Sequence, residues 1–295
     1  MRVFVTGATG FVGSAVVQEL LGAGHQVLGL VRSEEAAKKL AAGAEAHYGT
    51  LEDLDSLRRG AAAADGVIHT AFIHDFVDFA AASDTDRQAI EALGSELAGS
   101  QRPLIVCSGL AFLPQDRLAV ETDVPQVAGG YPRRSEETAA DLVAQGVRAM
   151  TVRLSPTTHG AGDHGFIHTL INIARATGEA AYIGDGSNRW PAVHRFDAAQ
   201  LFRLALEQGA AGARYHGVAE EGVPMRDIAA VIGRHLNLPV VSKTADEAAS
   251  HFGWMARFVG LNMAASSALT RQQLGWHPTH PTLLEDLEQG HYFKN

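Results

Sequence analysis

The chain has 295 residues, 46% of them hydrophobic, which is enough to bury one large core, or one core with a smaller appended lobe. Its net charge of -9 argues against a nucleic-acid partner. The single cysteine, Cys107, excludes an internal disulfide. No apolar stretch approaches the roughly 20 residues that span a bilayer, and the chain begins directly with MRVFVTG, without a charged leader. We therefore expect a soluble, cytoplasmic protein without a membrane partner.

Short apolar segments alternate with helical segments through the first half of the chain. The strands are expected at 3–5, 26–31, 66–71, 104–107 and 148–154. The helices are expected at 14–21, 34–42, 54–63, 86–97 and 136–144. This alternation predicts a parallel sheet that is covered by helices on both faces.

The regular alternation ends near residue 156. Short apolar runs are then mixed with helical patterns, at 180–183, 215–218 and 240–241 for the runs and at 167–176, 198–207, 225–236 and 246–258 for the helices. We predict an α/β protein with a doubly wound Rossmann domain at 1–155. A smaller C-terminal α/β substrate lobe at 156–295 is expected to be partly interleaved with it.

Residues 6–13, TGATGFVG, follow the first strand and open the first helix. Gly7 permits a tight turn, Gly10 lets the backbone approach a pyrophosphate, and Gly13 allows close packing of helix on strand. The helix N-terminus supplies N–H donors and a favourable dipole. This order of strand, glycines and helix predicts a dinucleotide site. Its predicted residues are Gly7, Thr9, Gly10, Phe11, Val12 and Gly13.

The end of the second strand indicates which dinucleotide binds. NAD-specific sites place an acidic residue there for the ribose 2′-hydroxyl, whereas this chain has Arg32 and Ser33. An arginine at that point pairs with a 2′-phosphate. We therefore predict NADP(H) rather than NAD(H), with Arg32 and Ser33 as contacts.

Five segments together resemble the extended or atypical short-chain dehydrogenase/reductase superfamily, in its epimerase/dehydratase-like branch. They are TGATGFVG, GVIHTAF (66–72), LIVCSG (104–109), VRLSPTTHGAG (152–162) and GDGSNRWPAVHRFDAAQL (184–201). The resemblance covers nearly the whole chain. It implies further cofactor contacts at Leu51, Thr70, Ala71, Phe72, Ser155 and Pro156.

The resemblance also implies catalytic residues. The family uses a Ser or Thr to bind the reacting oxygen, a Tyr to transfer a proton, and a Lys four residues later to lower the pKa of that tyrosine and hold the nicotinamide ribose. The matching residues here are Ser108 and Tyr131, but Ser135 stands at the lysine position. Arg133 and Arg134 are candidates for the missing charge. Tyr131 is therefore either a proton donor or an aromatic residue of the pocket wall or loop.

The chain has 14 histidines, some of which are candidate metal ligands. Asp163, His164 and His168 have a permissible spacing, but no further cluster completes a ligand set, so no metal is expected. His69 lies on an apolar strand and is interpreted as a core residue. His194 and Asp197 are interpreted as structural first and as pocket residues second.

The leading functional prediction is an NADP(H)-dependent oxidoreductase acting on a carbonyl or secondary alcohol of a small organic substrate. Mostly apolar residues on the expected pocket side favour a lipophilic substrate, namely Phe72, Ile73, Phe76, Phe112, Phe166 and Trp190. The alternatives are an epimerase or dehydratase with a recycled nicotinamide, and a non-catalytic NADP(H) sensor. The resemblance places a possible homodimer interface on the helices at 86–97 and 136–144.

Overall fold

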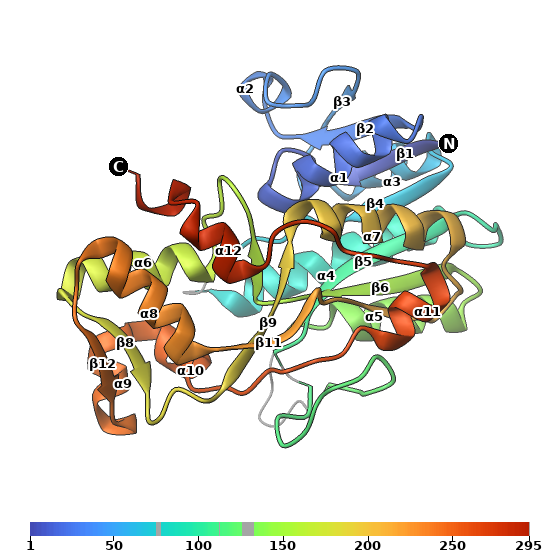
Figure 1. Cartoon of the computed structure of the whole chain (residues 1–295). Coiled ribbons are helices and arrows are strands. Elements are labelled where there is room, and N and C mark those ends of the chain that lie inside the picture. The colour runs from blue at the N-terminus through green and yellow to red at the C-terminus, as the bar shows by residue number, and fades with distance from the viewer. Residues whose placement is uncertain (75–77, 112, 126–132, 295) are drawn as a thin grey trace.

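The computed structural model of the protein describes residues 1–74, 78–111, 113–125 and 133–294. These residues form a seven-stranded parallel sheet with helices on both faces and a smaller α/β lobe beside it (Figure 1). The predicted fold class is confirmed. No helix in these ranges is long and apolar enough to cross a membrane.

The strand order of the large sheet is β10-β6-β5-β4-β1-β2-β3, and every neighbouring pair runs parallel. The strands are β1 (Arg2–Thr6), β2 (Gln26–Val31), β3 (Glu45–Tyr48), β4 (Gly66–His69), β5 (Pro103–Gly109), β6 (Arg148–Leu154) and β10 (Arg214–Gly217). The order reverses between β1 and β4. Sheets of this kind bind ligands outside the carboxyl ends of the strands at such a reversal, which places the candidate site there.

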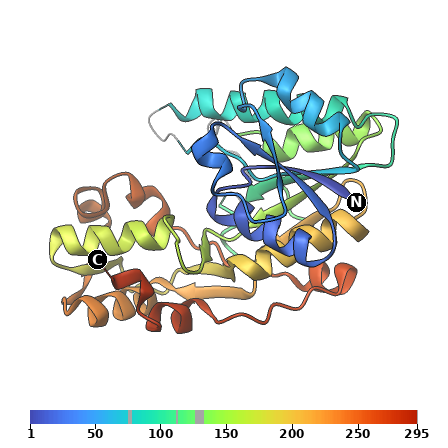
Figure 2. The same cartoon turned by 90° about the horizontal axis from the view of Figure 1, so that it is seen from above.

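The two faces of the sheet carry different helices (Figure 2). On one face α1 (Phe11–Gly22) packs against α7 (Arg195–Gln208). On the other face α3 (Leu54–Ala62), α4 (Phe79–Ser95) and α5 (Ser135–Ala144) pack side by side. Each layer encloses its own apolar core, so both faces of the sheet are buried.

The smaller lobe has a third apolar core. Its strands form a three-stranded sheet, β11-β9-β7, and a parallel pair, β12-β8. They are β7 (Thr157–His159), β8 (Ala180–Ile183), β9 (Arg189–His194), β11 (Glu220–Pro224) and β12 (Val240–Lys243). The helices after β6, apart from α7, are α6 (Phe166–Thr177), α8 (Met225–Leu236), α9 (Ala245–Phe252), α10 (Ala256–Val259), α11 (Ala268–Leu274) and α12 (Leu283–Glu288), with short 3₁₀ turns at Gly253–Met255 and His291–Phe293.

Several segments from the second half of the chain belong to the first lobe. β10 is hydrogen-bonded beside β6 and closes one edge of the large sheet. Helix α7 contributes Phe202 and Leu206 to the core that contains α1, and Trp276 lies in the same core. The chain therefore leaves the Rossmann domain after β6 and returns to it.

Two predicted helices differ from the structure because tertiary contacts and glycine intervene. The helix expected at 34–42 ends early, as α2 (Glu34–Ala37), and Leu40 packs beside Gly29, where an added Cβ would lie 2.8 Å from the Leu40 side chain. The helix expected at 246–258 is divided at Gly253, whose positive φ of +55° (ψ -130°) suits glycine and does not continue a helix.

Other differences concern where elements begin and strands that the patterns did not indicate. Helix α4 starts at Phe79, earlier than expected, because the Asp78 side chain caps it by accepting a hydrogen bond from Ala81 N at 3.1 Å. Strands β3, β7, β9 and β11 were absent from the pattern-based prediction. β9 contains Pro191, which interrupts a strand pattern.

A buried histidine on β10 makes the stability of the fold depend on pH. His216 is fully buried, accepts a hydrogen bond from Arg153 Nη1 at 3.1 Å through Nε2, and donates through Nδ1 to Ser266 O at 2.7 Å. Burial and the charge of Arg153 lower the pKa of His216 to about 4. The unfolded chain, with a histidine pKa of about 6.5, binds more protons than the folded protein between these two values.

The free energy of unfolding is therefore expected to fall as the pH drops from about 6.5 to 4, with His216 contributing up to about 1.4 kcal/mol per pH unit. Urea unfolding at a series of pH values measures this slope. A His216→Gln variant should show a shallower slope. An equal slope in both proteins would contradict the assignment to His216.

Candidate active site

The turn after β1 is shaped by two glycines with clear steric reasons. Gly7 has a φ of +71°, and a Cβ there would lie 2.8 Å from Thr70 Oγ1 and 2.9 Å from Ala71 N. A Cβ on Gly13 would lie 2.0 Å from Gly7 O. The tight turn and the close packing of α1 on it therefore need glycine at both positions, as the motif predicts.

Gly10 is different, because the fold alone places weaker demands on it. It is exposed, has an ordinary extended conformation (φ -77°, ψ 175°), and an added Cβ would meet only Gly7 O, at 3.2 Å. Gly10 is the N-cap of α1, and as a glycine it has no side chain to cap that helix. The amide groups of its first turn, including those of Phe11 and Val12, are therefore available to an anion.

Arg32 follows the last residue of β2 on the protein surface. Among the described residues it makes no hydrogen bond or ion pair, whereas the nearby Lys38 pairs with Glu35 at 2.7 Å. Ser33 caps α2, and its Oγ accepts from Ala36 N at 3.2 Å. Arg32 is thus an unpaired guanidinium, and the Ser33 hydroxyl proton is still free to be donated.

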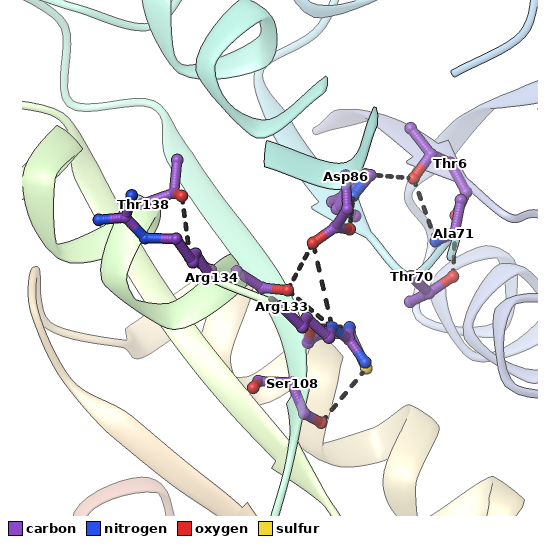
Figure 3. Close-up of polar contacts among 11 residues, drawn as sticks. Thr6, Thr70, Ala71, Asp86, Ser108, Arg133, Arg134 and Thr138 are labelled. Atoms are coloured by element: carbon purple, nitrogen blue, oxygen red, sulfur yellow. Dashed lines mark hydrogen bonds and ion pairs between the residues drawn. The ribbon is translucent and has the colours of Figure 1, made fainter. Parts of the chain in front are cut away.

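The other predicted cofactor residues lie in four places. Thr9 is half-buried in the glycine turn, while Leu51 is only 8% exposed and packs into the core. Thr70, Ala71 and Phe72 directly follow β4, and Thr70 Oγ1 donates to Thr6 O at 2.8 Å (Figure 3).

Ser155 and Pro156 follow β6, but the Ser155 hydroxyl is buried and donates to Gly217 O at 2.7 Å. Its side chain is therefore committed to β10 rather than directed at a ligand.

A buried polar network lies at the carboxyl ends of β1, β4 and β5 (Figure 3). Asp86, on α4, is 1% exposed and is bonded by His69 Nε2 at 3.1 Å and by Ser135 Oγ at 2.5 Å. His69 Nδ1 lies 2.8 Å from Thr6 Oγ1. Arg133 Nε donates to Ser135 Oγ at 2.8 Å and lies 4.0 Å from Asp86 Oδ2.

The network keeps the Asp86 carboxyl ionised. Burial opposes ionisation, but the hydrogen bond and charge of His69, the Arg133 charge and the Ser135 hydrogen bond together lower the pKa of Asp86 below its usual value. An ionised Asp86 only accepts hydrogen bonds, so His69 donates to it through Nε2, and Thr6 Oγ1 is the partner of His69 Nδ1. His69 is the buried residue that the sequence predicts, with a partner on each nitrogen.

The two arginines after the undescribed segment have different environments. Arg133 reaches inward, donates through Nη2 to Cys107 O at 2.9 Å, and places its Cζ 4.0 Å from the centre of the Phe72 ring. Arg134 is exposed and pairs with Glu137 instead. In Figure 3 the Arg134 guanidinium extends away from Asp86.

Ser108 is half-buried near the carboxyl end of β5, next to Cys107. The structure therefore brings Ser108, the Arg133 guanidinium and Phe72 to one end of the sheet. Burial raises the pKa of Cys107 to about 11, which keeps the thiol protonated near neutral pH. Tyr131, the expected proton donor, lies outside the described residues, as do Phe76 and Phe112.

Arg195 connects the second lobe to the glycine turn. Its Nη1 donates to Ala161 O at 3.0 Å, its Nη2 donates to Ser14 Oγ at 2.8 Å, and its Cζ lies 4.7 Å from the centre of the Phe11 ring. These contacts hold the loop after β7 against the start of α1.

His194 and Asp197 have the structural role expected for them. Asp197 is buried and accepts hydrogen bonds from His280 and Thr279, and His194 stacks on the His280 ring at 4.7 Å. Trp190, expected on the pocket side, is instead fully buried in the core of the second lobe.

Known proteins resemble this chain in sequence and in fold. Residues 7–177 match a family model described as NAD(P)H-binding. An uncharacterized protein of Schizosaccharomyces pombe is 54% identical over 297 residues, which cover 99% of this chain and all of the relative. A Stigmatella aurantiaca protein, named 4-hydroxy-2-methyl-3-oxo-4-farnesyl-3,4-dihydroquinoline-1-oxide ketoreductase, is 30% identical over 271 residues, which cover 86% of this chain and 80% of the relative.

Solved structures with a similar fold include an enzyme of the kind that the sequence motifs resemble. A crystal structure of dTDP-glucose 4,6-dehydratase from Streptomyces venezuelae with NAD bound has a TM-score of 0.80, over 99% of this chain and 97% of that chain, at 17% identity. The predicted resemblance to the epimerase/dehydratase-like branch of the short-chain dehydrogenase/reductases is confirmed. The chain therefore belongs to the NAD(P)H-binding family and has the Rossmann fold of the epimerase and dehydratase enzymes.

Proposed function

We propose that the protein is an NADP(H)-dependent oxidoreductase that reduces the carbonyl group of an apolar small molecule, or oxidises the corresponding secondary alcohol. The observation that supports the proposal most strongly is the arrangement at the carboxyl ends of the strands of the large sheet. The start of α1 after β1, the unpaired Arg32 after β2 and Ser108 near the end of β5 all lie at the carboxyl ends of strands in the same parallel sheet. Sheets of this kind bind ligands at the carboxyl ends of their strands.

The residues present fit a phosphorylated dinucleotide. The free amides of the first turn of α1 suit the pyrophosphate, and Gly10 leaves its backbone open to it. Arg32 and Ser33 offer a charged and a neutral donor to a 2′-phosphate. When bound, the nicotinamide supplies or accepts the hydride.

The remaining chemistry falls to the protein. Ser108 is assigned to donate a hydrogen bond to the carbonyl oxygen, where negative charge develops during reduction. Tyr131 is assigned to give that oxygen its proton. Both roles follow the family pattern, and Ser108 is half-buried at the right end of its strand.

An apolar substrate is favoured by an aromatic group in the second lobe. Phe166, at the start of α6, lies 5.9 Å from Trp254 and 5.1 Å from Phe258 between ring centres. Trp254 is 42% exposed. Aromatic faces of this kind bind apolar and aromatic ligands, and the ketoreductase relative is named for a farnesylated quinoline substrate.

NADPH absorbance during incubation with a panel of alkyl and aryl ketones, aldehydes and keto-sugars tests the proposed reaction. Stoichiometric loss of NADPH with formation of alcohol is expected. Product without net loss of NADPH would instead favour an epimerase or dehydratase. Tight cofactor binding with no product from any compound would favour the sensor.

Cofactor choice is tested by an Arg32→Asp substitution. The change removes a charge-assisted contact of about 1.5 to 3 kcal/mol and adds repulsion, so NADPH affinity should fall by more than about tenfold while NADH affinity changes far less. Calorimetric titration measures both. Arg226→Asp, an exposed arginine on α8 in the other lobe, makes the same change of charge and should leave both affinities unaltered. A wild type that binds NADH as tightly as NADPH would refute the assignment.

A further inference from the structure

Ser135 stands where the resemblance places a lysine, and the structure accounts for its side chain. Ser135 is the first residue of α5, is 1% exposed, and its hydroxyl bonds to Asp86 at 2.5 Å while accepting from Arg133 Nε at 2.8 Å. Ser135 therefore bridges the Asp86 carboxylate and the Arg133 guanidinium. The cation comes from a neighbouring position in the sequence.

The Arg133 guanidinium is fixed at its inner side and available at its outer side. Nε bonds to Ser135 and Nη2 to Cys107 O at 2.9 Å, while Nη1 makes no hydrogen bond to any described residue. The side chain is 18% exposed, and its charged end lies over the Phe72 ring. It can therefore donate to a ligand in the region that Ser108 and Phe72 border.

Asp86 accounts for the placement of Arg133. A buried carboxylate is tolerated only when it is paired and hydrogen-bonded, and the arginine paired with Asp86 is Arg133, 4.0 Å away. His69 and Ser135 hold the two oxygens of the carboxylate in place. The anion, its two donors and Arg133 come from β4, α4 and the start of α5, which the fold brings together.

We propose that the Arg133 guanidinium supplies the positive charge and the ribose contact at the nicotinamide end of the cofactor site that the missing lysine would supply, and that Asp86 positions it through Ser135. The proposal rests on the proposed function, since it requires a nicotinamide dinucleotide in this site. Arg134 has no part in it, because Arg134 is exposed and paired with Glu137.

Two ligands separate this contact from general cofactor binding. NADPH reaches the nicotinamide end, whereas 2′,5′-ADP carries the 2′-phosphate and adenosine but no nicotinamide ribose. Calorimetric titration of Arg133→Met should show NADPH affinity lower by about tenfold or more, as for a lost charge-assisted hydrogen bond, with 2′,5′-ADP affinity unchanged. Arg134→Met is the matched control and should bind both ligands as the wild type does.

Further variants test whether Asp86 positions Arg133 through Ser135. Asp86→Asn keeps a side chain that bonds to Ser135 but removes the paired charge, so it should weaken NADPH and leave 2′,5′-ADP binding intact. Arg133→Met/Asp86→Asn removes both charges together and leaves no unpaired carboxylate, in case the single Arg133 variant fails to fold. Arg133→Met/Ser135→Lys restores a cation at the family position and should recover NADPH affinity.

Two results would overturn the proposal. One is an Arg133→Met protein that binds NADPH as tightly as the wild type does. The other is an equal loss of affinity for both ligands, which would show that Arg133 supports the fold rather than the nicotinamide end. A wild type that binds neither ligand would refute the cofactor assignment itself, and a wild type that binds both but turns over no substrate would refute only the proposed reaction.

Discussion

Replacing Gly10 with valine is expected to abolish NADPH binding while the protein still folds. The N-cap backbone of Gly10 is extended and exposed, so a larger residue can adopt it with only a small adjustment around Gly7 O, 3.2 Å from the added Cβ. The valine side chain would instead occupy the approach to the free amides of α1, where the pyrophosphate is assigned. The loss should therefore fall on binding rather than on stability.

Calorimetric titration together with thermal unfolding tests this separation. Gly22→Val is a matched control at the far end of the same helix, because nothing lies within 4 Å of its added Cβ, and it should bind NADPH normally. Gly13→Val should instead destabilise the protein, since a Cβ at that position would lie 2.0 Å from Gly7 O. A folded Gly10→Val protein with wild-type affinity would remove the phosphate assignment.

Replacing Tyr131 with phenylalanine is expected to lower turnover by roughly 10² to 10⁴, the range for a lost general acid, with little change in cofactor affinity. Ser108→Ala should cost a similar or smaller factor, because it removes the hydrogen bond to the developing oxyanion. Steady-state rates with a ketone substrate and separate NADPH titrations measure the two effects.

Tyr182→Phe, on β8 in the second lobe, is the control for loss of a phenol and should keep full activity. If Tyr131→Phe also retains most of its activity, the proton comes from elsewhere. His74, in the loop after β4, would then be the next residue to replace. Burial and the neighbouring Arg133 lower the pKa of His74, which makes its protonated ring a stronger acid.

Much of the Rossmann half of the molecule could be predicted from the sequence. The glycine motif predicts the turn at Gly7 and the close packing at Gly13, because both depend on the absence of a Cβ at a fixed position. The apolar strand runs around 26–31 and 148–154 are found at those positions. Local signals of this kind need no knowledge of the distant chain.

The arrangement around Asp86 could not be predicted in the same way. Arg133 and Arg134 are neighbours with the same side chain, and only the fold decides that one reaches Asp86 while the other reaches Glu137. Asp86 looks like an ordinary polar residue near the start of a helix. Its burial depends on where α5 packs against α4. His69 and Asp86 are likewise far apart in the sequence, and only the fold brings them together.

The return of the chain to the large sheet limits how this protein can be divided. A fragment ending at residue 155 would retain β6 but lose β10, leaving the hydrogen-bonding edge of β6 open to pairing with other chains. It would also lose α7 and Trp276 from the core beneath α1. The Rossmann half is thus completed by sequence that follows β9. Insertions in the loops between the two lobes should therefore be tolerated more readily than replacement of one lobe by that of another protein.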